Sequence, residues 1–254
     1  MFVACSTLCF SRRSLPQALT IIAELGFTKA EIAIHERGPH LKPSEVVGDL
    51  HVLAQQLKVG PGVVPSAFDV AIDAPDFEHF QERLLAICKL ARVAAVPLLT
   101  LNAAPAGSDL DAEVARCKKM VAIGEAEGII ISLGTRIGTL TEYPDTAAQL
   151  CQRAPGLALT LDPSHYIAGP HQGKDYDDLY PFVKHVHLRD TGRGPNQFQV
   201  RVGQGEVEYG RIISMLEREE YDRLLTIEVR DIPDAAFPME PEVRKLKYLL
   251  ESMV

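Results

Sequence analysis

The sequence predicts one closed (β/α)8 barrel, a TIM barrel, over residues 1–254. Short apolar runs rich in β-branched residues recur along the chain without polar alternation, as in strands buried on both faces of a parallel sheet. Each run is followed by a loop and a helical pattern. Eight such units in 254 residues give about 32 residues per unit, as expected for this barrel. No linker rich in Pro, Gly or Ser divides the chain, so we expect a single domain.

The expected strands are short, and most of their positions are apolar. They are Phe2–Ser6, Lys29–Ile34, Lys58–Val64, Pro97–Leu101, Ile129–Leu133, Leu157–Leu161, Lys184–Leu188 and Leu224–Val229. An open doubly wound sheet is the main alternative, and it predicts a Gly-rich phosphate-binding turn after the first strand. Residues 6–11 contain no glycine, so dinucleotide binding has no support.

Start and stop signals place a helix after each strand. Gly26 follows the first helical pattern and Gly128 follows the fourth, as expected of residues that end a helix. The expected helices are Ser14–Leu25, Pro43–Leu57, Asp76–Val93, Asp109–Glu127, Pro144–Arg153, a short helix near Asp175–Tyr180, Tyr209–Glu219 and Glu240–Met253. The strict alternation favours a closed parallel barrel.

Charge and cysteine content limit the classes of partner. The chain has 26 Lys and Arg against 34 Asp and Glu, a net charge of −8, which disfavours a nucleic-acid scaffold. Five scattered cysteines without a CxxC pair indicate reduced thiols. No apolar run approaches the ~18 residues of a membrane span. We expect a cytoplasmic protein that acts on a small molecule, with no nucleic-acid or membrane partner.

The last three strands carry the most informative polar residues. In such a barrel the functional groups lie at the carboxyl ends of the strands. Asp162 follows the sixth expected strand, His187 lies near the end of the seventh, and Glu228 lies near the end of the eighth. Two carboxylates and an imidazole suit Mn²⁺, Mg²⁺, Co²⁺ or Zn²⁺. Adjacent strands would bring the three to one point, so we expect a metal site there.

Each of these residues also has an ordinary structural role. Asp162 before Pro163 is typical of a helix cap, Glu228 can pair with an arginine, and His187 can be a hydrogen-bonded interior residue. Three such residues at equivalent depths on consecutive strands favour the joint metal hypothesis over three independent structural roles.

Several short motifs together suggest a family. They are Ser6-Thr7-Leu8, Leu25-Gly26-Phe27, Glu31, Leu161-Asp162-Pro163-Ser164-His165, His185-Val186-His187-Leu188-Arg189-Asp190, Gly203-Gln204-Gly205-Glu206-Val207, and Tyr221 leading into Ile227-Glu228. In this order the chain resembles the xylose isomerase-like TIM barrels of the sugar phosphate isomerase/epimerase type. The resemblance implies a metal held by Glu, Asp, His and Glu from strands five to eight.

The resemblance carries over only in part. Asp162, His187 and Glu228 match three of the four metal ligands, but Gly134 stands where the strand-five Glu belongs. His165 matches a His that contacts substrate, and Arg193 matches a substrate-binding Arg in the loop after strand seven. In the family's epimerases two Glu exchange protons on opposite faces of a metal-bound substrate, so the loss of one removes a ligand and a base.

The remaining residues leave two roles open for Arg136. It is either a substrate-binding cation for a carboxylate or phosphate, or an internal partner of Asp162 or Glu228 that replaces the metal. Glu228 alone can support one-base chemistry, so we name Glu228 and His165 as the catalytic candidates. Glu142 is a weaker substitute for the missing Glu, since a helix start explains it better.

Three functions follow. The first is a divalent-metal-dependent isomerase or epimerase of a sugar, a polyol or a hydroxy-carbonyl compound. The second is a catalytically reduced barrel that binds a sugar-like ligand. The third is a one-base dehydratase or lyase of a small anionic substrate. An endonuclease-IV-like repair enzyme is disfavoured by the acidic charge and the missing Glu. Family members often pair, so the resemblance is compatible with a homodimer.

Overall fold

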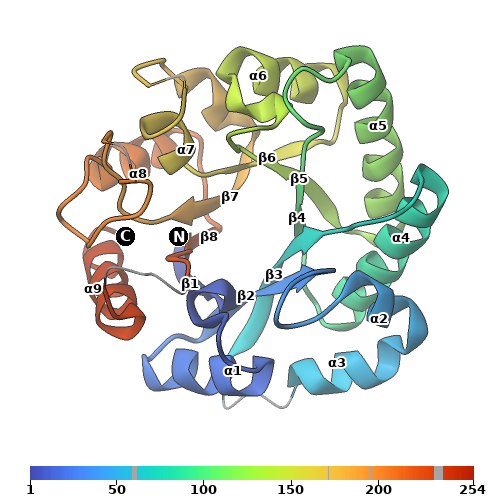
Figure 1. Cartoon of the computed structure of the whole chain (residues 1–254), viewed down its shortest axis with the longest axis horizontal. Helices are drawn as coiled ribbons and strands as arrows, with labels where there is room; N and C mark the ends of the chain where they lie inside the picture. Colours follow the sequence, from blue (N-terminus) through green and yellow to red (C-terminus); the bar gives the residue numbers. More distant parts are fainter. Residues whose placement is uncertain (59–61, 171, 195, 232–236) are drawn as a thin grey trace.

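Eight parallel strands close into a barrel in which each strand pairs with the next and β8 pairs with β1 (Figure 1). The computed structural model describes residues 1–58, 62–170, 172–194, 196–231 and 237–254. The strands are β1 (Phe2–Ser6), β2 (Lys29–His35), β3 (Val64–Ala71), β4 (Leu98–Asn102), β5 (Ile130–Gly134), β6 (Ala158–Leu161), β7 (Val183–Leu188) and β8 (Leu224–Ile227). The predicted TIM barrel is confirmed.

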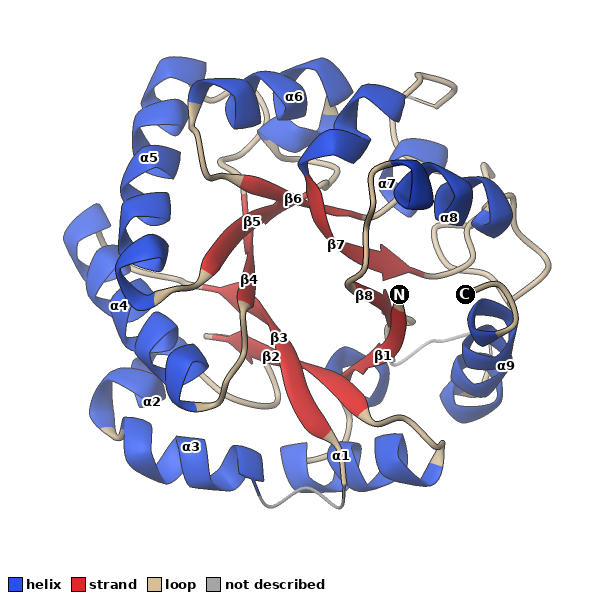
Figure 2. Ribbon diagram, turned by 180° about the vertical axis from the view of Figure 1, so that it is seen from behind, coloured by secondary structure: helices blue, strands red, loops and turns tan. Residues whose placement is uncertain are grey.

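Helices surround the strands, as the view from behind also shows (Figure 2). They are α1 (Leu15–Glu24), α2 (Pro43–Gly48), α3 (Leu50–Lys58), α4 (Phe77–Val93), α5 (Leu110–Glu127), α6 (Pro144–Arg153), α7 (Ser164–Ile167), α8 (Tyr209–Arg218) and α9 (Met239–Glu251), with 3₁₀ helices η1 (Thr7–Phe10), η2 (Leu140–Glu142) and η3 (Asp177–Phe182). Their buried apolar faces cover the outer face of the barrel and form the main core with it.

The third strand differs from the prediction. The sequence predicts Lys58–Val64, but Lys58 belongs to α3, residues 59–61 lie outside the described part, and β3 begins only at Val64. Pro65 and Ser66 obscure the strand pattern. The pairing of β2 with β3 shifts register at this point, where Ala30 lies opposite Pro65 and Glu31 opposite Ala67. This bulge accommodates a proline, which has no N–H to give to the ladder.

The helices mostly follow their predicted signals. Asp109 accepts a hydrogen bond from the N–H of Ala112 at the start of α5, and Gly128 ends that helix at φ 74°. The left-handed conformation at Gly128 explains why a glycine stands there. The helix predicted at Pro43–Leu57 is instead divided into α2 and α3, and the short helix predicted near Asp175–Tyr180 is η3.

The inside of the barrel is polar, which is unusual for a layer that branched apolar side chains commonly fill. Thr100 and Thr160 are 2.7 Å apart at their hydroxyl oxygens, and Ser132 hydrogen-bonds to the same Thr160 hydroxyl. Glu31 and His185 lie in the same interior and are almost completely buried. The three hydroxyls hydrogen-bond to one another and His185 contacts Glu31 Oε2, whereas Glu31 Oε1 has no hydrogen-bond partner among the described residues.

All five cysteines are buried and free, so the thiols belong to the packed interior. Among the described residues, no helix is both long enough and apolar enough to cross a membrane.

Candidate functional site at the barrel mouth

Asp162, His187 and Glu228 meet at the carboxyl ends of β6, β7 and β8. One donor atom from each lies within 4.8 Å of the others, and all three side chains are buried. They meet because consecutive parallel strands end at the same edge of the barrel. The donor types and their spacing are those of a group that can hold a metal ion.

A guanidinium already lies among these donors. Arg189 Nη2 donates to Asp162 Oδ2 at 2.5 Å and lies 3.1 Å from Glu228 Oε2. The Arg189 side chain is 1% exposed, and its guanidinium carbon lies 5.1 Å from the centre of the Phe198 ring. Arg189 therefore links the two carboxylates that the resemblance assigns to a metal.

Glu228 has a second arginine partner. Arg230 donates from Nε and from Nη2 to Glu228 Oε1, each at 2.7 Å. Burial alone would raise the pKa of Glu228, but Arg230, Arg189 and His187 outweigh it and hold that pKa well below its usual value. Glu228 is therefore an anion that attracts protons only weakly.

His187 bridges two carboxylates. Its Nδ1 lies 2.8 Å from Glu228 Oε2 and its Nε2 lies 2.7 Å from Glu31 Oε2. Both nitrogens must carry a proton to serve both acceptors. Burial lowers the pKa of His187, but the attraction of Glu31 and Glu228 is stronger and raises it well above the ordinary value. An imidazolium has no lone pair to give to a metal.

Glu31 lies deeper, between two histidines. The same oxygen, Oε2, also lies 2.8 Å from His185 Nε2, so Glu31, His185 and His187 form a second group of metal-competent side chains. Burial favours a protonated Glu31, yet His187 and His185 lower its pKa to about 2. Burial lowers the pKa of His185, which is consistent with a neutral donor to the Glu31 carboxylate.

The residues as arranged do not fit a divalent ion. Asp162 Oδ1 accepts from Ser164 through both its N–H and its hydroxyl, so both oxygens of Asp162 have partners. Three carboxylates (Glu31, Asp162, Glu228) face three cations (Arg189, Arg230 and protonated His187), so the cluster is neutral without an ion. An ion would have to displace Arg189 and take the place of a proton on His187.

His165 lies over the same carboxylates but is a hydrogen-bond donor. Its Nδ1 accepts from the N–H of Ile137 at 3.1 Å, which leaves the proton on Nε2, 3.5 Å from Asp162 Oδ2. Burial lowers the pKa of His165 to about 4, and the Asp162 carboxylate does not offset this. The ring is therefore neutral at neutral pH and presents an N–H.

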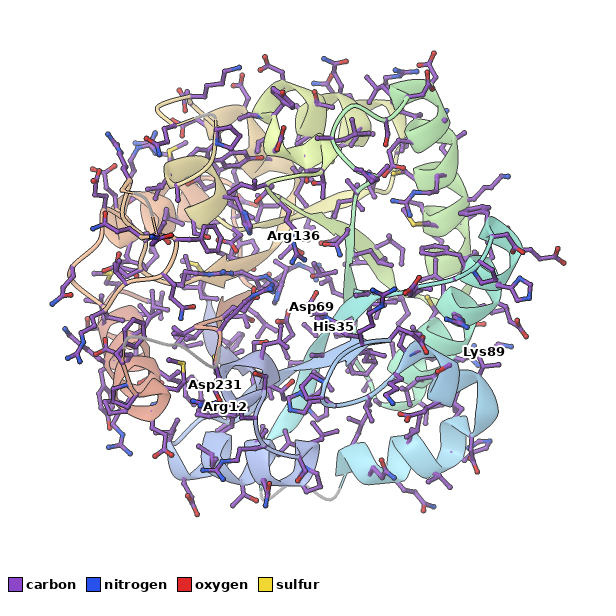
Figure 3. The ribbon with its side chains drawn as sticks, in the orientation of Figure 1. Arg12, His35, Asp69, Lys89, Arg136 and Asp231 are labelled. Atoms are coloured by element: carbon purple, nitrogen blue, oxygen red, sulfur yellow. The ribbon has the colours of Figure 1, made fainter. Side chains whose placement is uncertain are left out.

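Arg136 follows β5 and lines the pocket at the mouth together with Asp69, which Figure 3 labels with it. Its Nη1 donates to Asn102 Oδ1 at 3.0 Å, and it forms no ion pair among the described residues. Of the two roles predicted for Arg136, the internal pairing with Asp162 or Glu228 belongs to Arg189 instead. Arg136 keeps its charge available at the mouth.

Gly134 ends β5 beside Asn102 on β4 and Thr160 on β6. A Cβ placed on Gly134 would lie 3.6 Å from Thr100 Cγ2 and 3.8 Å from the Leu101 carbonyl oxygen, both ordinary contacts. The backbone therefore does not require glycine here, and the absent carboxylate is not a consequence of crowding.

Arg193, predicted to bind substrate, lies elsewhere. It is 58% exposed and pairs with Glu206, Nε to Oε2, at 2.9 Å. It lines a separate pocket of about 590 Å³ beside Tyr176 and Arg211. The structure does not bring Arg193 to the mouth.

The opening itself is narrow. The pocket at the mouth has about 20 Å³ open to water, roughly the room for one molecule. Its lining comes from six strand ends: Asp69, Thr100, Asn102, Gly134, Thr135, Arg136, Asp162, His165, His187, Glu228 and Arg230.

Sequence reasoning missed Arg189, Arg230 and the pair His35–Asp69, whose Nε2 and Oδ2 lie 3.0 Å apart. The signal for the arginines was the two-residue alternation of a strand, since Arg189 follows His187 by two positions and Arg230 follows Glu228 by two. Asp69 lies within β3 (Val64–Ala71) but beyond the end of the strand that the sequence predicts at Lys58–Val64.

Comparisons with known proteins agree with the barrel. The family described as xylose isomerase-like TIM barrel matches residues 19–250. A search among curated proteins returns no match. A xylose isomerase domain protein from Alicyclobacillus acidocaldarius is similar in structure, with 16% identity, a TM-score of 0.79, and 100% of this chain and 98% of that chain covered.

Two further solved structures have names that state an activity. The probable 3-DHS dehydratase AsbF from Bacillus anthracis has 18% identity, a TM-score of 0.75, and 97% and 98% of the two chains covered. D-psicose 3-epimerase with D-tagatose from Clostridium cellulolyticum H10 has 12% identity, a TM-score of 0.74, and 100% and 99% covered. At these identities the structures show a shared fold. With the family match over most of its length, the chain belongs to the xylose isomerase-like TIM barrel family.

Proposed function

We propose that this barrel binds a small, anionic, sugar-like hydroxy-carbonyl compound at its mouth and does not carry out two-base epimerisation. One observation carries the proposal: the acidic and imidazole groups that line the mouth are already engaged. Glu228 is held by Arg230 and His187, and Asp162 by Arg189 and Ser164. No carboxylate stands at Gly134 on the opposite side.

Proton abstraction from carbon needs a base whose pKa lies near the working pH. Glu228 has a pKa well below the usual value because Arg230 and Arg189 stabilise its anion. His165 has a pKa of about 4, and its acceptor nitrogen is occupied by the Ile137 N–H. Neither catalytic candidate is poised to remove a proton, which supports binding over turnover.

The mouth can still recognise a ligand. The guanidinium of Arg136 donates to the Asn102 side chain and forms no ion pair among the described residues, and His165 offers its Nε2–H. A carboxylate on the ligand matches Arg136, and a neighbouring hydroxyl or carbonyl oxygen matches His165. The ligand class is therefore a sugar acid or a small hydroxy-keto acid rather than a neutral ketose.

Calorimetric titration with sugar acids and with the neutral sugars of the same chain length tests this proposal. We expect the acids to bind and the neutral sugars to bind at least about tenfold more weakly. Arg136→Met should remove that preference, because it deletes the cation but keeps much of the volume. Arg193→Met is the matched control and should leave affinity unchanged, since Arg193 lies in the other pocket. Equal affinity of wild type and Arg136→Met would contradict the proposal.

A one-base dehydratase or lyase of a small anionic substrate is the second candidate. The position of Arg136 close to His165 and Glu228 in one pocket favours it, because a bound acid would lie beside both. Incubating the bound acids in D₂O and following C–H exchange by NMR separates the two. Exchange that Glu228→Gln abolishes would establish the second candidate over simple binding.

The metal-dependent isomerase or epimerase implied by the resemblance is the competing function, and it requires an ion held by Asp162, His187 and Glu228. Mn²⁺, Mg²⁺, Co²⁺ and Zn²⁺ are the ions to test. We further propose a cytoplasmic protein without a nucleic-acid partner, supported by five free buried thiols and a net charge of −8. We also propose that two copies of the chain form a homodimer, which a measurement of the molecular mass in solution would test.

A further inference from the structure

We infer that the guanidinium of Arg189 takes the place of a divalent ion in this barrel, so that the site is complete as a cluster of protein ions. The inference rests on where Arg189 lies and on the partners of the neighbouring donors. It does not depend on which ligand the mouth binds.

The guanidinium of Arg189 lies between the carboxylates of Asp162 and Glu228. Arg189 Nη2 contacts Asp162 Oδ2 at 2.5 Å and Glu228 Oε2 at 3.1 Å. The candidate donor atoms of Asp162, His187 and Glu228 lie within 4.8 Å of one another. An ion bound to both carboxylates would need the same space between them. Arg189 Nη2 and such an ion are therefore mutually exclusive.

The other donor atoms of the site also have partners. Glu228 Oε1 receives two hydrogen bonds from Arg230, and Asp162 Oδ1 receives two from Ser164. Both ring nitrogens of His187 are hydrogen-bonded to carboxylates. The metal-ligating atoms of Asp162, His187 and Glu228 are therefore all engaged by partners within the protein. Each of the three carboxylates has a cationic partner within the protein, as buried charges need, whereas Glu31 Oε1 and Arg189 Nε have no hydrogen-bond partner among the described residues.

Arg189 cannot leave this position easily. It follows β7, and the strand end is pinned by the bond from the Glu228 N–H to the Leu188 carbonyl and by that from the Val200 N–H to the Asp190 carbonyl. The guanidinium lies against Phe198, and the side chain is 1% exposed. Turning it outward would take the arginine away from the buried Asp162 carboxylate, which is costly, while Glu228 would keep Arg230 and His187.

The carboxylate that the family resemblance places at position 134 is absent from this chain. A carboxylate at position 134 would add a negative charge and a fourth donor, but Gly134 supplies neither. With one acid fewer, the three internal cations offset the three carboxylates of the cluster without an added ion. The substitution at Gly134 and the burial of Arg189 fit the same metal-independent site.

Metal binding to chelator-treated protein tests the inference, measured by calorimetry with Mn²⁺ and Zn²⁺ and by the visible absorption of Co²⁺. The variants are Arg189→Met, the double variant Gly134→Glu with Arg189→Met, and the control Arg153→Met. Arg153 pairs with Asp111 on the surface, so its loss removes an arginine without touching the mouth. We expect no stoichiometric binding by wild type or Arg153→Met. Arg189→Met should bind one ion, and the double variant at least about tenfold more tightly.

Each outcome is informative. Binding of one equivalent of metal ion by the wild-type protein would overturn the inference. Visible absorption bands of Co²⁺ in both the wild-type protein and Arg153→Met would overturn it as well. The inference would also be overturned if Arg189→Met and the double variant both fold but bind no metal ion. In that case the guanidinium would not be what excludes the ion. If Arg189→Met unfolds when metal-free and recovers its circular dichroism with Zn²⁺, the inference is supported. If it stays unfolded, the wild-type melting temperature decides: no change with chelator supports the inference, and a drop overturns it.

Discussion

Glu228 is contacted by Arg230, His187 and Arg189 at 2.7, 2.8 and 3.1 Å respectively. A carboxylate with three cationic neighbours is stabilised as an anion, so it supports the fold better than it abstracts protons. Its environment separates two roles that the sequence could not separate, since a Glu at a strand end is equally compatible with a ligand and with an ion-pair partner.

Glu228→Gln should destabilise the barrel strongly. The change keeps the shape but removes one of the negative charges that offset Arg189, Arg230 and His187, so buried positive charge is left uncompensated. We expect the free energy of unfolding to fall by about 3 kcal/mol. Urea denaturation measures it.

Asp111→Asn is the control for that experiment. Asp111 is 81% exposed and pairs with Arg153 on the surface. Its replacement should change stability by less than about 1 kcal/mol. Equal effects of the two substitutions would show that the Glu228 cluster contributes no more than an exposed ion pair.

At the scale of the elements, β7 and the residue after its end contribute His185, His187 and Arg189, which succeed one another at every second position. The sequence predicts that Asp162, His187 and Glu228 lie close together, because each follows or ends an apolar run and consecutive parallel strands end at the same edge of a barrel. It does not predict which arginine turns inward. Arg136 and Arg189 both follow strands, and only the tertiary structure places Arg189 between the carboxylates.

The third strand shows a different limit. Its apolar pattern is interrupted by Pro65, Ser66 and Asp69, so no periodic run marks β3. The pairing of β2 with β3 contains a bulge at Pro65 and Ser66, and beyond it the two strands pair in a regular register. Strand pairing is a long-range property, and a local pattern cannot report it.

Gly134 at the end of β5 and Gly124 on α5 differ in the space that each leaves for a side chain. A Cβ at Gly134 meets only ordinary contacts, whereas one at Gly124 on α5 would lie 2.6 Å from the Ile129 carbonyl oxygen and 2.6 Å from Ile131 Cγ1. We expect Gly134→Ala to be within about 0.5 kcal/mol of wild type. Gly124→Ala should destabilise by about 2 kcal/mol despite the better helix propensity of alanine.

Thermal unfolding of the two alanine variants makes this comparison. A large loss at Gly134 would mean that the backbone itself demands glycine there. The missing carboxylate would then be a structural consequence rather than a change in the chemistry of the site.

For the whole molecule, the interior of the barrel is held by an ionic cluster in place of the usual branched side chains. Glu31 is fully buried, yet the two histidines hold its pKa at about 2 against an ordinary value of 4.5. The folded state therefore binds fewer protons than the unfolded state between these values. The stability that Glu31 contributes is present above about pH 4.5 and is lost as the pH falls toward 2.

Acid unfolding should therefore distinguish wild type from Glu31→Gln. The fall in pKa to about 2 corresponds to about 3 kcal/mol at neutral pH. Other carboxylates also protonate, so the expected signal is the difference between the two proteins in urea midpoints from pH 2 to 7. Glu31→Gln should be less stable at pH 7, with the gap closing toward pH 2. A gap that is constant with pH would contradict the assigned pKa.

In the wild-type protein the guanidinium of Arg189 stands where a metal ion would otherwise bind. A crystal of the wild-type protein soaked in Mn²⁺, with anomalous scattering recorded, tests it most directly. We predict continuous density for Arg189 between Asp162 and Glu228 and no anomalous peak at the mouth. An anomalous peak at bonding distance from Asp162, His187 and Glu228, with Arg189 turned away, would contradict the account.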